Sequence, residues 1–194
     1  LWNNSESDFK SRDIGPGNCL IDSWVRKNSN IKFDKDGSLA NRGKVNEVIL
    51  EQAQELYLNK KKTNTFSLDV NDFDVSFARG LSLEDGAATL TDFTGRIIGS
   101  QLFNIIPNKK NKTCKVLLSG GGRKNKTLLK KIKERSQKNI IFQPIDKYGV
   151  NGDFVESQAF AFIGIRSFIN EPISFPGTTG CSKPCTGGEI VKIR

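Results

Sequence analysis

The stretch TCKVLLSGGGRKNKTLLKKI, residues 113 to 132, constrains the fold of this chain more than any other. A compact apolar segment leads through three consecutive glycines into a segment in which Leu128, Leu129 and Ile132 recur at helical spacing. A buried strand, a tight turn and an amphipathic helix form the βα unit of an α/β sheet. The sequence therefore predicts an α/β protein.

Strands and helices are predicted to alternate along the rest of the chain. The expected helices cover 18–27, with Asn18 at the N-cap, 37–58, 82–104 and part of 149–168. One expected strand ends at Asp13, and another covers 139–142. The polar, lysine-rich residues 59–72 are expected to form a surface loop.

The last expected helix is rich in aromatic and aliphatic residues, and we expect it to bury them. The side chains concerned are those of Phe154, Ala159, Ala161, Phe162, Ile165 and Phe168. The segment also carries a carboxylate pair, Asp153 and Glu156, near its start. Such residues are either partners of the helix dipole or members of a site.

The chain is basic, with 30 Lys and Arg against 21 Asp and Glu and a formal net charge of +9. Aromatic residues are not interleaved with the basic clusters, as a base-stacking surface would require. We interpret the charge as a solvated surface or as a field that attracts a phosphorylated small molecule, and not as a nucleic-acid interface. No run approaches the roughly 18 apolar residues of a membrane span.

Histidine is absent, and there are four cysteines. The lack of histidine excludes Ser-His-Asp and Cys-His catalytic units, so the chemistry falls to carboxylates with Lys, Arg or a bound cation as helpers. Zinc would need thiolates from dispersed positions. Cys181 and Cys185 form a C-x3-C pair to which the sequence assigns no role. Sparse cysteines favour a reducing, cytoplasmic setting.

Two glycine turns are candidates for a ligand site. The first lies in RDIGPGNCLID, residues 12 to 22, and the second is the SGGG of residues 119–122. Consecutive glycines let a ligand approach the backbone, and the helix that follows offers free N–H groups and a positive dipole end. The second turn matches neither a P-loop nor a dinucleotide fingerprint, so a tight βα connection is the alternative.

Several motifs, taken in order, resemble the C-terminal half of the anhydro-N-acetylmuramic acid kinase family. They are GPGNCLID after Asp13, DGAATLTDFTG, SGGGRKN, GDFVESQAFAFIGIR, and FPGTTG followed by GGEI. That family belongs to the superfamily of sugar kinases, actin and heat-shock ATPases. The resemblance implies a ribonuclease-H-like lobe, with a mixed central sheet and helices on its faces. Residues 1–194 would form a single C-terminal lobe of a two-lobed kinase whose N-terminal lobe is absent.

The resemblance also implies an activity. The intact enzyme would use ATP and Mg²⁺ to open the 1,6-anhydro ring of anhydro-N-acetylmuramic acid with water and to phosphorylate O6. Its product would be N-acetylmuramic acid 6-phosphate, an intermediate of cell-wall sugar recycling. Because the chain begins with Leu1 and contains no Met, we expect a fragment with little or no kinase activity of its own.

The resemblance assigns roles to individual residues. It implies that Asp13 is the general base that activates water, a role that suits a carboxylate. It implies a phosphate-binding turn, an adenosine-binding loop and a carboxylate near the substrate and metal. The phosphate-binding turn would consist of Gly15, Gly17 and Asn18. The adenosine-binding loop would consist of Gly120, Gly121, Gly122 and Asn125, and the carboxylate would be that of Glu156. The chain has Ile14 where the family usually has Thr, so any contribution of that hydroxyl is lost.

Two other functions remain open at this point. One is a nucleotide-binding lobe of the same superfamily whose partner is a protein instead of a sugar. The other is a catalytically idle domain, for instance one that forms a homodimer, in which both glycine turns serve packing only. Binding of ATP and Mg²⁺ at the glycine turns separates the idle domain from the other two.

Overall fold

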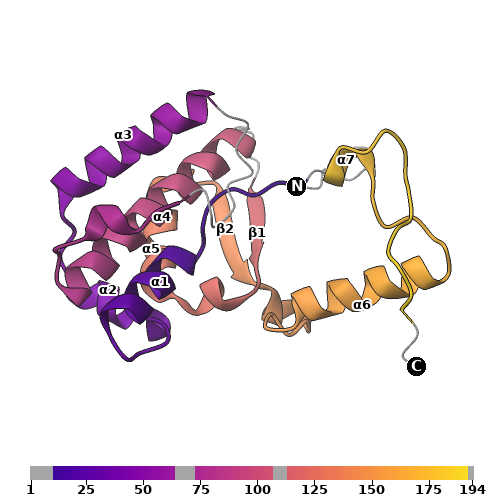
Figure 1. Cartoon of the computed structure of the whole chain (residues 1–194), viewed down its shortest axis with the longest axis horizontal. Coiled ribbons are helices and arrows are strands. Elements are labelled where there is room, and N and C mark those ends of the chain that lie inside the picture. Colours follow the sequence, from indigo (N-terminus) through magenta and orange to yellow (C-terminus); the bar gives the residue numbers. More distant parts are fainter. Residues whose placement is uncertain (1–10, 64–72, 107–112, 192–194) are drawn as a thin grey trace. The chain divides into compact units, whose positions relative to one another are not determined.

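The computed structural model describes residues 11–63, 73–106 and 113–191, without the side chains of 59–63 (Figure 1). The chain divides into two compact units. The larger one covers Asp13–Val150, and the other combines residues 1–12 with 151–194. Whether the whole chain forms one lobe of a two-lobed protein stays a prediction.

The larger unit is a mixed α/β structure in which helices dominate. Its helices are α1 (Cys19–Asn28), α2 (Ser38–Arg42), α3 (Glu47–Thr63), α4 (Leu83–Ile105) and α5 (Lys126–Arg135). Its strands are β1 (Cys114–Leu118) and β2 (Ile140–Pro144). Short 3-10 turns cover Lys35–Gly37, Ser76–Ala78, Gly121–Lys124 and Ile145–Tyr148.

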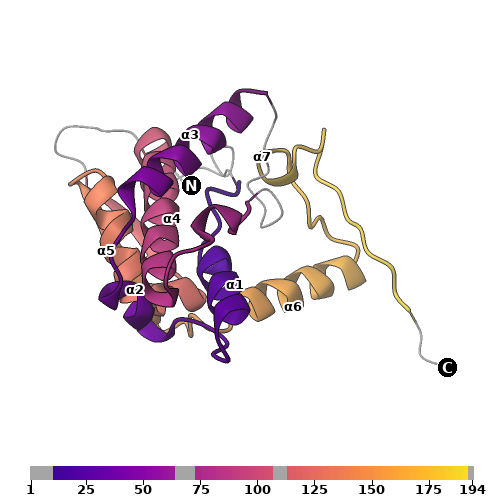
Figure 2. The same cartoon turned by 60° about the vertical axis from the view of Figure 1, so that its left-hand side comes forward.

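Helix α4 forms the centre of this unit. Its start is fixed by Ser82, whose hydroxyl accepts a hydrogen bond from the Asp85 amide at 3.1 Å, and acidic residues in the first turn suit the helix dipole. A helix that is buried on nearly all sides must pack against neighbours on more than one face. Figure 2 shows α4 between α5 and α1, and all three contribute to one hydrophobic core.

Glycines let the neighbours of α4 approach closely. A Cβ on Gly86 would overlap the indole of Trp24, whose Nε1 donates a hydrogen bond to the Leu83 carbonyl at 2.9 Å. A Cβ on Gly95 would lie 2.6 Å from Lys131 Cβ, and one on Gly99 would lie 2.5 Å from Arg135 Cβ. The glycines of α4 therefore set the distance to α1 on one side and to α5 on the other.

Gly86→Ala is expected to destabilise the larger unit by about 2 kcal/mol, because the added methyl group must displace the buried Trp24 ring. The matched control is Gly164→Ala in another helix, where an added Cβ meets no atom within 4 Å. That control should leave stability unchanged or slightly raised, since alanine favours helix. Chemical denaturation followed by circular dichroism measures both, and equal effects of the two substitutions would contradict the packing argument.

A buried carboxylate connects α4 to α5 and α3. The Asp92 side chain is 2% exposed, and its oxygens lie 2.5 Å from Lys131 Nζ and 2.9 Å from Arg96 Nε, with Arg135 at 3.5 Å. Arg96 also pairs with Glu47 of α3 at 2.8 Å. Burial alone would raise the pKa of Asp92, but hydrogen bonds and charges from Lys131 and Arg96 outweigh it and hold that pKa below its ordinary value of 3.8.

The two strands pair in parallel, from Cys114 opposite Ile140 to Leu118 opposite Pro144. Helix α5 makes the connection between them, as the sequence predicted for a βα unit. Alternate residues of the strands, such as Val116 and Phe142, pack against the helical core, while Leu117 and Ile141 on the opposite face are exposed. In the part of the chain that the structure describes, the sheet contains these two strands.

Several expected elements are confirmed, and others are wrong. Helices α1 and α4, strand β2 and the unit β1–α5 lie where the sequence predicted them. The single helix expected over 37–58 is broken into α2 and α3, because the linker is held by α4. Lys44 and Asn46 donate their amides to Asp85 Oδ1 at 2.7 Å and Thr89 Oγ1 at 3.0 Å. The loop expected at 59–72 is also wrong at its start, since α3 continues to Thr63, and 64–72 lie outside the described residues.

The other unit contains α6 (Val155–Phe168) and α7 (Pro176–Thr179), and Ser174 and Cys185 form an isolated antiparallel bridge. The prediction that α6 buries its apolar side chains is wrong for this chain: none of them is buried, and Phe154, Phe162, Ile165 and Phe168 are 57%, 60%, 64% and 72% exposed. The same holds for the alanines at 159 and 161, which are exposed. The described part of this unit supplies no second layer to cover the helix. The strand expected to end at Asp13 is not formed over residues 11–13, and residues 1–10 lie outside the described part.

None of the described helices is both long enough and apolar enough to cross a membrane.

Candidate functional site

The GPGN turn leads into α1 and is anchored on α4. A Cβ on Gly15 would lie 2.7 Å from Ile98 Cγ1, so this glycine allows the turn to rest on the core. Gly17 has a φ of +56°, which favours glycine, and no atom lies within 4 Å of where its Cβ would be. The Cys19 amide then donates to the Pro16 carbonyl at 3.1 Å, which closes the turn onto the helix.

The SGGG turn follows directly after the end of β1. Gly120 combines a φ of +71° with a ψ of −176°, a conformation open only to glycine. Asn125 ends the turn and caps α5, because its Oδ1 accepts a hydrogen bond from the Leu128 amide at 3.0 Å. The turn thus lies beyond the carboxyl end of a parallel strand, where ligands of open α/β sheets bind.

A side-chain hydrogen bond joins the two turns, although 107 residues separate them in sequence. Asn125 Nδ2 donates to Asn18 Oδ1 at 3.1 Å. Asn18 occupies the N-cap position of α1, as predicted, but its side chain makes no capping bond and is directed to Asn125 instead. A hypothetical Cβ on Gly121 would lie 3.9 Å from Asn18 Nδ2. The structure therefore brings together the two turns that the sequence marked separately.

A cavity of about 560 Å³ opens at this junction. This volume falls within the range of roughly 300–1,000 Å³ that small-molecule pockets occupy. The cavity is lined by Asn18, Asp22, Arg26, Gly121, Lys124, Asn125 and residues 32–36. Burial raises the pKa of Asp22, although the charge of Arg26 opposes that shift. Four of the lining residues are cationic and three are acidic, so the cavity carries charges of both signs.

The glycines of the two turns differ in what they are needed for. Gly15 is required for packing, and the positive φ of Gly17 and Gly120 explains those two. Neither packing nor a positive φ explains Gly121 and Gly122. Their φ values lie outside the left-handed region. A Cβ would meet no atom within 4 Å at Gly122 and one atom, at 3.9 Å, at Gly121. Packing alone does not account for these two glycines, and their open backbone suits a ligand that comes close.

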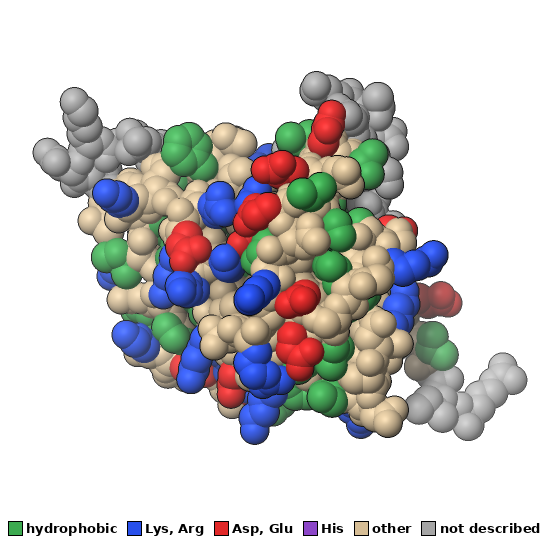
Figure 3. Space-filling model, turned by 90° about the vertical axis from the view of Figure 1, so that its left-hand side faces the viewer, with side chains coloured by type: hydrophobic (Ala, Val, Ile, Leu, Met, Phe, Trp, Pro, Cys, Tyr) green, Lys and Arg blue, Asp and Glu red, His purple; other side chains and the backbone are tan. Residues whose placement is uncertain are grey.

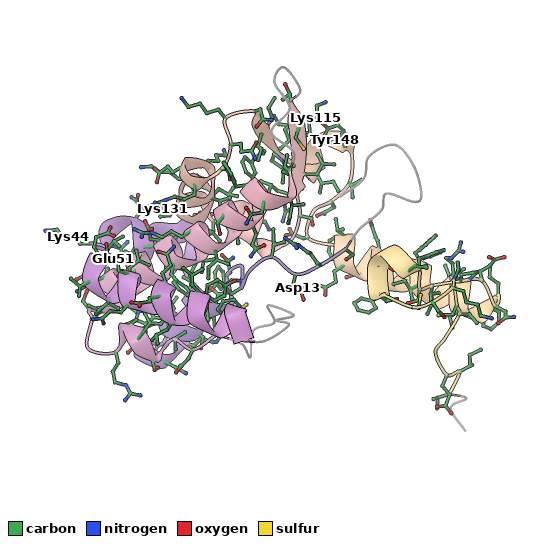
Figure 4. All side chains as sticks on the ribbon, turned by 90° about the horizontal axis from the view of Figure 1, so that it is seen from above. Asp13, Lys44, Glu51, Lys115, Lys131 and Tyr148 are labelled. Atoms are coloured by element: carbon green, nitrogen blue, oxygen red, sulfur yellow. The ribbon has the colours of Figure 1, made fainter. Side chains whose placement is uncertain are left out.

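The two predicted carboxylates have different positions. Asp13 is exposed on the segment that leads to the GPGN turn, and Figure 4 shows it apart from the labelled Lys44, Lys115 and Lys131. The following residue, Ile14, packs against the core and fixes the backbone next to it. Glu156 is exposed in the first turn of α6, in the other unit, so its association with the cavity stays a prediction.

No group of three or more Cys, Asp or Glu side chains in the described residues is arranged to hold a metal ion. On the face drawn in Figure 3, basic and acidic side chains are interspersed and form no continuous basic stripe.

Comparison with known proteins assigns the family. The family model described as anhydro-N-acetylmuramic acid kinase matches residues 4–192. Curated relatives with that name include proteins from Pelagibacter ubique, 47% identical over 97% of this chain, and Brucella anthropi, 39% identical over 98% of it. The chain belongs to the anhydro-N-acetylmuramic acid kinase family.

The chain spans about half the length of the anhydro-N-acetylmuramic acid kinases it matches. Its match covers 50% of the Pelagibacter ubique protein and 49% of a 36% identical relative from Zymomonas mobilis. The resemblance stated from the motifs is confirmed at the level of the family. The roles of the individual site residues stay predictions.

The sequence did not indicate that residues 32–36 form a wall of the cavity. The expected helix began at residue 37 and residues 32–36 were assigned to no element, yet Asp36 and Gly37 form a turn with φ values of 57° and 74°. The signal was present in the Asp-Gly pair at 36–37, which is typical of turns with left-handed residues.

Proposed function

We propose that this chain is the nucleotide-binding part of an anhydro-N-acetylmuramic acid kinase. It would form a ribonuclease-H-like lobe, as in the superfamily of sugar kinases, actin and heat-shock ATPases. The observation that carries the proposal is the open backbone at Gly121 and Gly122, next to the junction of the two glycine turns. The membership of the family supports the substrate class. The alternative of an idle domain with packing glycines is disfavoured, because a Cβ at these two positions would meet at most one atom within 4 Å.

The nucleotide is proposed to lie across the two turns. Backbone N–H groups of Gly15, Gly17 and Asn18 would face the β- and γ-phosphates, and the Gly120–Gly122 turn would receive the adenosine. Lys124 and Arg26, both at the cavity, would balance phosphate charge. Mg²⁺, held by phosphate oxygens, would neutralise the charge that develops during phosphoryl transfer.

Asp13 is proposed as the general base. Its carboxylate would accept a proton from a water molecule whose oxygen attacks the anomeric carbon of the anhydro sugar. The bond from that carbon to O6 then breaks, and O6 takes the γ-phosphoryl group, which leaves ADP and N-acetylmuramic acid 6-phosphate. Glu156 is proposed to lie near the sugar and the metal in the complete enzyme.

The complete site needs a further part of the protein. The relatives are about twice as long as this chain, which fits a second lobe that binds most of the sugar. We expect the 194-residue chain alone to bind Mg·ATP but to show little or no kinase activity. A cytoplasmic enzyme of cell-wall sugar recycling, as a monomer or a homodimer, fits this activity.

The test uses a chimera in which this chain replaces the matching residues of the Pelagibacter ubique relative, 47% identical to it. The purified chimera is incubated with ATP, Mg²⁺ and anhydro-N-acetylmuramic acid, and products are identified by mass spectrometry. We expect a product that has gained one water molecule and one phosphoryl group. A folded chimera that binds ATP and does not phosphorylate this sugar would contradict the proposed substrate.

A further inference from the structure

We propose that the turn Asp34–Gly37 is a positioning element of the nucleotide site. It holds the Asn125 side chain in place, and through Asn125 it holds the glycine turn that receives the nucleotide. The inference rests on the proposed function and adds residues that the motifs did not include. It follows from three sets of contacts around Gly37, Thr127 and Asn125.

The turn itself is fixed by a buried carboxylate. The Asp34 side chain accepts hydrogen bonds from the amides of Leu39 at 2.8 Å and Ala40 at 3.0 Å, at the start of α2. Asp34 is 4% exposed, so these bonds are shielded from water. Asp36 and Gly37 follow in successive left-handed conformations, which turn the chain sharply toward α5. These hydrogen bonds and left-handed residues define the shape of the turn.

Gly37 is the point at which this turn meets the nucleotide site. Its carbonyl oxygen accepts a hydrogen bond from Thr127 Oγ1 at 2.7 Å. A Cβ on Gly37 would overlap Asn125 Oδ1 and the Thr127 side chain. Glycine at this position thus lets the turn contact Asn125 directly, and a larger residue must push Asn125 away.

Asn125 links the turn Asp34–Gly37 to the start of α5, to Asn18 and to the SGGG turn. It is 3% exposed, its oxygen caps α5 through the Leu128 amide, and its nitrogen donates to Asn18. Its backbone amide also donates to the Gly122 carbonyl at 3.1 Å. A displacement of Asn125 therefore moves the SGGG turn and loosens its link to Asn18. The side chain of Asn125 is occupied by protein contacts, so it affects the nucleotide through the position of the turns.

Gly37→Ala tests the proposal, with Gly80→Ala as the matched control. Both glycines have a positive φ, +74° and +90°, so both substitutions strain the backbone, but a Cβ on Gly80 meets no atom within 4 Å. Binding of the analogue AMP-PNP with Mg²⁺ to the full 194-residue chain is measured by calorimetry, together with the Tm. We expect Gly37→Ala to raise Kd about tenfold and Gly80→Ala to leave it within about twofold.

Thr127 provides a second, milder pair of variants in case Gly37→Ala does not fold. Thr127→Val removes the hydrogen bond to the Gly37 carbonyl, and we expect Kd to rise about fivefold. Thr127→Ser keeps the hydroxyl and should bind within about twofold of wild type. A purely structural role would lower the Tm of these variants without changing Kd.

The outcomes separate the inference from the proposed function. Tight binding by wild type with weakened binding by Gly37→Ala and Thr127→Val supports both. If wild type binds and these two variants bind equally well, the positioning role is wrong and the proposed function stands. If wild type does not bind the nucleotide, the proposed function fails and the inference fails with it.

Discussion

Asp13→Asn in the chimeric kinase is expected to lower kcat by about a thousandfold, within the range that general-base catalysis contributes. Asparagine has nearly the same shape as aspartate, but its amide does not accept a proton from the attacking water. The backbone at this position is fixed by Ile14, which packs against the core, so the substitution should not disturb the GPGN turn. The affinity for Mg·ATP should therefore stay within about twofold.

The control for this prediction is Glu51→Gln, which makes the same chemical change at an exposed carboxylate on α3. Figure 4 shows Glu51 apart from Asp13. Steady-state kinetics measured with both variants should show a loss of kcat for Asp13→Asn alone. Normal turnover by Asp13→Asn would remove the assignment of the base, while the nucleotide site would remain in place.

Asp92→Asn is expected to lower the free energy of unfolding by roughly 3 kcal/mol at neutral pH. The substitution removes the carboxylate that Lys131 and Arg96 share and leaves both cations next to a buried amide. Glu84→Gln is the control on the same helix, because its ion pair with Arg42 is exposed and spans 3.6 Å. That pair should contribute less than about 0.5 kcal/mol. Urea denaturation followed by circular dichroism gives both values.

The pH dependence gives Asp92 a second test. Its pKa is lower in the folded protein than the ordinary value of 3.8, so its stabilisation is fully present above that value. The stabilisation is lost as the pH falls through the lower, folded pKa. The difference between wild type and Asp92→Asn should thus be large at pH 6 and shrink at pH values well below 4, as linkage requires. A difference that stays constant with pH would assign the effect to packing instead of charge.

The local elements were predicted well where the sequence pattern itself decides the structure. The strand, the glycine turn and helix α5 follow from apolar spacing and from the conformations that only glycine adopts. Helix α4 was also predicted, because its apolar residues recur over six turns. These elements position both glycine turns, so the places of the two turns could be predicted from the sequence, while the roles of their residues stay predictions.

Long-range contacts account for what was missed. Nothing local shows that Lys44 and Asn46 are held by side chains of α4, and these bonds break the helix that the spacing favoured. The bond between Asn18 and Asn125 and the contact of Gly37 with Asn125 join segments that are far apart in sequence. The prediction that α6 buries its apolar side chains was wrong for a related reason. The spacing of apolar residues indicates that a helix is apolar, but it does not indicate which part of a protein covers that helix.

The central claim is that the nucleotide binds across the GPGN and SGGG turns. The most direct measurement is a titration of the isotopically labelled 194-residue chain with Mg·AMP-PNP, followed by amide chemical shifts. We predict saturable shifts at Gly15, Gly17, Asn18 and Gly120–Gly122. No shifts, or shifts confined to the smaller cavity of about 200 Å³ beside Trp24 and Arg79, would contradict the account.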